Sequence, residues 1–171
     1  MSKNFFIAIK GLTHKSINFT LYFVLIGVMF LGCGRDELEL PEQELEGLIN
    51  GKEWSYKSAN GYLQSSDFKY RVRFLSSEES VSDPCTLPSP SLTHVRAIFK
   101  PAVGSFFVSS QAIDNNQVEV YFEISTSQNL KAQSGTMEIF AIEGQIIYGF
   151  LDAALDDENK VLGSFEIRLC N

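Results

Sequence analysis

Two segments of this chain alternate strictly between apolar and polar residues, and this alternation limits the fold more than any other feature. Within residues 67–74, the polar face carries Lys69, Arg71 and Arg73, and the apolar face carries aromatic and branched side chains. Residues 117–124 repeat the pattern. A period of two residues is typical of a strand with one buried and one solvated face. The sequence therefore predicts half-buried antiparallel β-strands.

Turn-forming residues separate these strands from other short apolar segments. Asn50-Gly51 and Glu143-Gly144 are tight-turn signals, and Asp156 begins a polar turn cluster. The segments between turns give about nine strands. They are residues 47–50, 53–57, 67–74, 94–100, 105–110, 117–124, 135–143, 145–152 and 162–169. The expected fold is all-β, either an antiparallel β-sandwich or a lipocalin-like, partly closed barrel.

Residues 1–33 have the order of charges and apolar residues that is typical of an export signal. Three lysines and no acidic residue precede an apolar segment at 20–31, and Gly32-Cys33 follows. This order resembles a bacterial lipoprotein signal peptide, which implies cleavage before Cys33 and acylation of its thiol. A transmembrane anchor is the alternative, but it normally needs roughly 20 apolar residues.

The resemblance divides the chain into three parts and implies where it resides. Residues 1–32 are the signal peptide, 33–46 the lipidated cysteine with a flexible acidic tether, and 47–171 a single β domain. Lipoproteins of this kind are anchored in the outer membrane of the cell envelope by acyl chains such as palmitate. The run Arg35-Asp36-Glu37 resembles a signal for display on the cell surface. The ends of the β domain are similar to small β-rich surface lipoproteins, which supply no catalytic residues to transfer.

Charge and cysteine content restrict the chemistry further. The chain carries a net charge of −7, and the leader contributes only lysines, so the mature part is more acidic still. A nucleic-acid-binding protein needs a basic face to neutralise phosphates, so nucleic acid is not expected as a partner. In an exported chain, the pair Cys85 and Cys170 predicts a disulfide. Two free thiols are the alternative.

The candidate binding residues lie on the polar strand faces. Tyr121 is an aromatic residue on the polar face of its strand, where it can stack on a sugar or anchor a protein partner. Lys69, Arg71 and Arg73 form a basic stripe that suits an acidic partner. The alternative interpretation of both features is an ordinary solvated sheet face.

Candidates for catalysis and metal binding are weak. His94 alternates with Arg96 and is expected to face water, which disfavours a catalytic triad or a zinc site. Glu119 and Glu123 are about 13 Å apart along a strand, beyond the roughly 5–9.5 Å of glycosidase carboxylates. One acidic turn provides a weak calcium candidate, although a solvated turn is favoured because the EF-hand spacing is missing. Its residues are Asp152, Asp156, Asp157 and Glu158.

The sequence therefore favours a non-enzymatic, lipid-anchored envelope protein with a binding or assembly role and no cofactor. Its expected partners are the membrane, through Cys33, and a glycan, peptide or protein at the cell surface. Two alternatives stay open. A closed barrel would allow carriage of a small apolar ligand. A pair of carboxylates on neighbouring strands within a cleft would allow hydrolysis.

Overall fold

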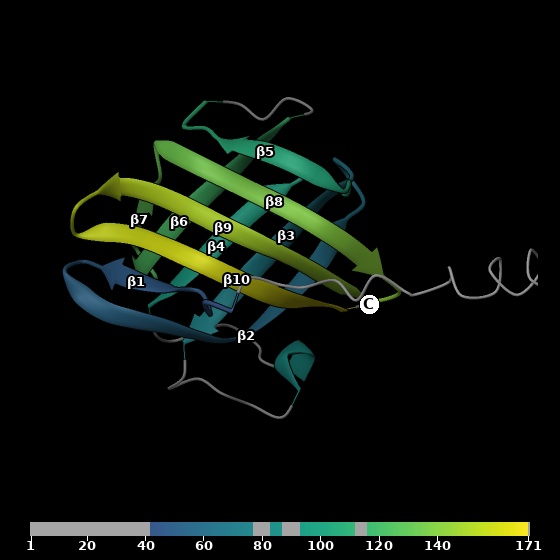
Figure 1. The fold of residues 1–171 in the computed structure, drawn as a ribbon, viewed down its shortest axis with the longest axis horizontal. Coiled ribbons are helices and arrows are strands. Elements are labelled where there is room, and N and C mark those ends of the chain that lie inside the picture. The colour runs from purple at the N-terminus through teal and green to yellow at the C-terminus, as the bar shows by residue number, and fades with distance from the viewer. Residues whose placement is uncertain (1–41, 77–82, 87–92, 112–115, 171) are drawn as a thin grey trace, which may run out of the picture. The chain divides into compact units, whose positions relative to one another are not determined.

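The computed structural model describes residues 42–76, 83–86, 93–111 and 116–170. Within them, ten strands and one short 3-10 helix form a β-barrel (Figure 1). The elements are β1 (Glu46–Ile49), β2 (Lys52–Gln64), β3 (Lys69–Ser76), η2 (Pro84–Thr86), β4 (His94–Phe99), β5 (Gly104–Val108), β6 (Gln117–Ser125), β7 (Gln128–Lys131), β8 (Ser134–Glu143), β9 (Ile146–Asp156) and β10 (Asn159–Cys170).

The strand order shows how the barrel closes. The order is β4-β3-β2-β1-β10-β9-β8-β5-β6-β7, and β4 also pairs with β6. That antiparallel pairing runs from His94 opposite Glu123 to Ile98 opposite Glu119. Nine strands thus form a closed ring, and β7 extends β6 as the tenth. The all-β prediction is confirmed, and the barrel alternative is the one that the structure shows.

The inner face of the barrel is filled by apolar side chains. Phe74 and Phe165 form an edge contact with ring centroids 5.1 Å apart, and Phe99 and Phe106 lie 6.1 Å apart. These pairs join strands that are not sheet neighbours, so the rings meet inside the barrel. Side chains that are at most 1% exposed complete the core. They include Leu45, Val72, Val95, Val118, Val120, Phe122, Met137, Ile139, Ile147, Leu151 and Ile167.

Strand β2 is longer than the sequence indicates. The sequence ends this strand at Lys57, before Asn60-Gly61, a pair that normally favours a turn. In the structure the strand continues to Gln64. A Cβ atom on Gly61 would lie 3.1 Å from the side chains of Ile167 and Val72. Close packing inside the barrel therefore favours glycine at this position.

The barrel begins earlier than the predicted boundary at residue 47. Leu45 is completely buried, and Glu46 already pairs with Ser55 of β2 and with Leu162 of β10. The acidic neighbours of Leu45 give this segment the composition of a tether, but they alternate around an inward-facing leucine. Cys33 and the predicted leader lie outside the described residues. In the described ranges, no helix is long and apolar enough to cross a membrane.

The predicted disulfide between Cys85 and Cys170 is present, with the Cα atoms 5.6 Å apart. It joins η2 to the end of β10 on the outside of the barrel. The side-chain amide of Asn60 donates to the carbonyl of Pro84 (2.6 Å), and the Tyr62 hydroxyl donates to the carbonyl of Cys85 (3.4 Å). The bridge and these hydrogen bonds fix the described part of the β3–β4 connection against β2 and β10.

Candidate functional site

The outer faces of β3, β4, β6 and β7 gather most of the predicted binding residues on one wall of the barrel. The strand register places Arg73 opposite Arg96, Arg96 opposite Tyr121, and Tyr121 opposite Lys131. These four side chains form a single line across four strands, which we name the cation row. On β3 and β6, the residues on both sides of Arg73 and of Tyr121 point into the barrel, so Arg73 and Tyr121 must point outward. The inward residues are Val72, Phe74, Val120 and Phe122.

The other two predicted residues, Arg71 and Lys69, lie earlier on β3. Arg71 occupies the adjacent position on β3, opposite Ile98 of β4. Its guanidinium donates to the side chain of Gln64 and lies 3.3 Å from the carboxylate of Asp67. Lys69 begins β3 next to the β2–β3 turn, away from the row. The structure thus brings Arg71, Arg73 and Tyr121 to one wall and leaves Lys69 at its edge.

Tyr121 is held between cations. The Arg96 guanidinium carbon lies 4.3 Å from the ring centroid, and the Lys131 ammonium lies 5.4 Å from it. The phenol donates to Glu119 Oε2 at 2.5 Å. Desolvation, together with this hydrogen bond to a carboxylate, raises the pKa of Tyr121 to about 12. The phenol therefore stays neutral at ordinary pH, and its ring serves to position Arg96 and Lys131.

His94 does not face water, which corrects the sequence-based expectation. It is 6% exposed, and its Nε2 lies 2.8 Å from Glu123 Oε2. The other carboxylate oxygen of Glu123 accepts from Arg96 Nε. The predicted alternation of inward and outward residues in this strand is correct, since His94 does lie on the outer face. Its burial follows from the pairing of β4 with β6, which the local sequence does not encode.

Arg73 differs from the other two cations of the cation row in its ion pairing. Arg96 is paired with Glu123, and Lys131 lies 3.3 Å from Glu119. Among the described residues, no carboxylate forms an ion pair with Arg73. Like charges directly opposite each other on neighbouring strands destabilise a sheet. Two adjacent guanidiniums are, however, well suited to bind one carboxylate through charge-assisted hydrogen bonds.

An exposed aromatic side chain lies on the same wall. Phe106 points into the barrel, so Phe107 points outward and is 65% exposed. Phe107 pairs with Gln117, at the start of β6, the strand that carries Tyr121. Exposed aromatic rings next to arginines are typical of protein interfaces. Sequence alternation shows that one ring of this pair must point outward, but it does not show that the ring lies beside the start of β6. There, four strand positions, about 13 Å, separate it from Tyr121.

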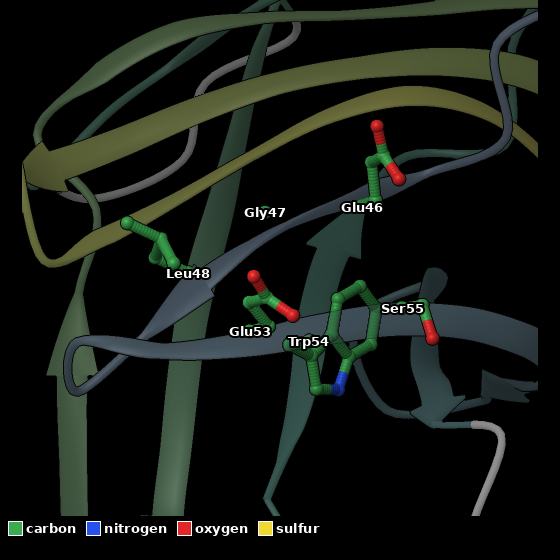
Figure 2. A pocket seen from close by; sticks show the side chains of 6 residues that line it. All are labelled: Glu46, Gly47, Leu48, Glu53, Trp54 and Ser55. Atoms are coloured by element: carbon green, nitrogen blue, oxygen red, sulfur yellow. The ribbon is translucent and has the colours of Figure 1, made fainter.

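A hollow of about 620 Å³ lies at the β1–β2 hairpin (Figure 2). Glu46 and Glu53 both line it, and they occupy diagonal positions on neighbouring strands. Such a pair is the arrangement that a carboxylate-dependent hydrolase would require. Both carboxylates are exposed, however, whereas a glycosidase acid is kept protonated by an apolar environment. Trp54 is buried, and its indole N–H donates to the carbonyl of Thr93, so it offers no open stacking surface.

The calcium candidates are distributed along the β9–β10 hairpin. Asp156 Oδ1 accepts hydrogen bonds from the Glu158 amide (3.0 Å) and from the Asn159 side chain (2.9 Å). Asp157 lies 3.7 Å from Lys160, and Asp152 sits farther back on β9, opposite Leu162. In the part of the chain that the structure describes, no three acidic, histidine or cysteine side chains are placed to share a metal ion. The two hydrogen bonds of Asp156 make it a turn-stabilising group.

Comparisons of this chain with protein-family models, with curated proteins and with solved structures found no match. The candidate site is therefore defined by its own geometry: the cation row, with Arg71 and Phe107 on the same wall.

Proposed function

We propose that this chain is a lipid-anchored, non-enzymatic protein of the bacterial outer membrane whose outer wall binds an acidic segment of a protein partner. The observation that carries the proposal is Arg73, which lies directly opposite Arg96 and has no carboxylate partner among the described residues. A carboxylate from a partner would relieve the repulsion between the two guanidiniums. It would also form the bidentate contacts for which arginine is suited.

The surroundings of the cation row favour a protein over a glycan. Binding of a sugar typically uses an open aromatic face, but the ring of Tyr121 already contacts Arg96 and Lys131. Phe107 supplies an exposed apolar anchor on the same wall, as protein interfaces commonly do. Carriage of a small apolar ligand has less support, because bulky side chains fill the inner face of the barrel.

The binding proposal predicts that Arg73→Gln weakens binding of an acidic peptide. The full lipidated chain in detergent would be titrated into a fluorescein-labelled decaglutamate peptide, and anisotropy would report binding. Loss of one charge-assisted contact is worth about 1.5–3 kcal/mol, so we expect a dissociation constant at least about tenfold higher. The salt concentration should be near 0.15 M, where charges farther away than about 8 Å are screened.

Lys52→Gln is the matched control, since Lys52 is an exposed cation on β2. It should leave the affinity unchanged. Equal affinities of wild type and Arg73→Gln would rule out the site. An equal loss in both variants would mean that only net charge matters. A galacturonate oligomer of matched charge that binds more tightly than the peptide would identify a glycan as the partner and overturn the protein assignment.

The anchor is tested by intact-mass spectrometry of protein purified from membranes. We expect the mass of residues 33–171 plus acyl chains, because the leader resembles a lipoprotein signal. A mass for the full chain, or for a chain without acyl groups, would contradict lipid anchoring and the outer-membrane location that depends on it.

A further inference from the structure

Three large apolar side chains are exposed at one end of the barrel. Phe68 in the β2–β3 turn is 71% exposed, Val103 in the β4–β5 turn is 61% exposed, and Leu63 near the end of β2 is 49% exposed. Leu63 pairs with Tyr70, and Tyr70 pairs with Phe99, so both turns lie just beyond the same strand positions. We name these three side chains the apolar tip. Exposed apolar groups that gather in this way mark contacts with a partner or a membrane.

The backbone at Phe68 adds to the argument. Its φ angle is +51°, in the left-handed region that bulky residues rarely adopt. This conformation costs roughly 1–2 kcal/mol for a non-glycine residue. Burial of the ring does not offset that cost, because the side chain is mostly in solvent. A strained conformation that holds an aromatic ring away from the protein points to a function for the exposed ring.

The first described residues enter the barrel from the side of the apolar tip. Cys170, at the end of β10, is beside Tyr62, which is next to Leu63. Glu46 pairs with Leu162, whereas the carbonyl of Gln43 accepts from the amide of Ser164. Going backward from Glu46, the chain therefore runs toward the end of β10, where the apolar tip lies.

Few residues separate the barrel from the predicted anchor. Cys33 is nine residues before Glu42, the first residue described. A chain of that length spans at most about 30 Å. Ser164 is six positions before Cys170, which is about 20 Å along a strand. An acylated Cys33 can therefore be in a bilayer that touches the end of the barrel.

We propose that the apolar tip inserts into the lipid bilayer that holds the acyl chains of Cys33. The inference rests on the acylation included in the proposed function. Phe68, Val103 and Leu63 would enter the boundary between headgroups and acyl chains, where interfacial segments are buried about 5–10 Å deep. At this end the acidic Asp67 and Glu143 are balanced by Lys69 and Lys100, so the contact is apolar rather than electrostatic. Its strength should not depend on anionic lipid. The cation row, on the side wall, remains open to a partner.

Tryptophan reporters test this orientation. Phe68→Trp and Val103→Trp would each be made in the full lipidated chain and reconstituted into phosphatidylcholine vesicles. The lipids would carry bromine near the headgroup end of the acyl chains. Leu162→Trp is the matched control, since Leu162 is also exposed (40%) but lies on β10 opposite Glu46, away from the tip. Trp54 is buried in every variant and provides a constant background.

We expect brominated lipid to quench the emission of both tip reporters and to leave the Leu162→Trp reporter unchanged. If the tip reporters on acylated protein are not quenched, the inference is overturned. Equal quenching of the tip and control reporters would also overturn it, because the barrel would then lie with its side on the bilayer. Mass spectrometry of the same sample reports acylation, and an unacylated sample overturns the anchor and this inference together. Peptide binding is measured in detergent and is independent of these results. If the apolar tip does not insert into the bilayer, the cation row can still bind an acidic peptide.

Discussion

Replacing Cys85 and Cys170 together by alanine is expected to lower the free energy of unfolding by about 4 kcal/mol. The bridge joins residues separated by 85 positions, so it removes much conformational freedom from the unfolded chain. It also fixes η2 against the outside of β2, where the Asn60 amide and the Tyr62 hydroxyl donate to the carbonyls of Pro84 and Cys85. Loss of the bridge would weaken this arrangement as well.

Urea unfolding followed by circular dichroism would measure the effect. Wild-type protein under reducing conditions is the control, since it should lose about the same stability as the double variant. Each single alanine variant should match the double variant, because either one removes the bridge. A loss below about 1 kcal/mol in the double variant would mean that the cross-link hardly restricts the unfolded state. A large loss in the double variant alone would indicate that the alanines, rather than the missing bridge, disturb the barrel.

Strand alternation predicts the two faces of this barrel well, but it does not predict which strands become neighbours. It places Val118, Val120 and Phe122 inward, as the structure shows, because a period of two is a local property of the backbone. Closure depends on the pairing of β4 with β6 and on the short parallel pairing of β5 with β6. Neither pairing has a signal in the local sequence. The sequence therefore leaves both a sandwich and a barrel open.

The same distinction explains what the sequence reveals of the candidate site. Strand alternation in the sequence shows that Arg71, Arg73 and Tyr121 point outward. The sequence does not show that Arg96 and Lys131 lie beside them, because these neighbours are set by the register between strands. Strand β7 also escapes prediction, since four residues with only one apolar side chain give almost no alternation. The face of the strand on which a side chain lies is a local property of the sequence, whereas the neighbour of each outward side chain is set by the fold.

Removing the charge of Glu123 is expected to destabilise the barrel while strengthening anion binding. The carboxylate of Glu123 contacts both Arg96 and His94, and the three side chains are only 7–23% exposed. Removing one partner of a fully buried ion pair costs about 3–5 kcal/mol because the other charge stays desolvated. With the partial exposure seen here, Glu123→Gln should cost about 2 kcal/mol.

Asp157→Asn provides the comparison for stability. Asp157 and Lys160 also form an ion pair, but their side chains are fully exposed and 51% exposed, respectively. Exposed pairs contribute about 0–1 kcal/mol, so this variant should unfold at nearly the wild-type urea concentration. If both variants lose equal stability, the buried position of Glu123 has no special importance. Urea titrations of the two variants alongside wild type would show the difference.

The effect on binding separates a recognition role for the cation row from a purely structural one. Glu123→Gln leaves Arg96 without its carboxylate, so an acidic peptide should bind more tightly than to wild type. Arg73→Gln should do the reverse: it weakens binding and costs little stability, since none of the described carboxylates pairs with Arg73. The two variants would then change stability and affinity independently. If affinity fell together with stability in both variants, the arginines would serve the fold alone. Loss of affinity would then follow from loss of the folded structure.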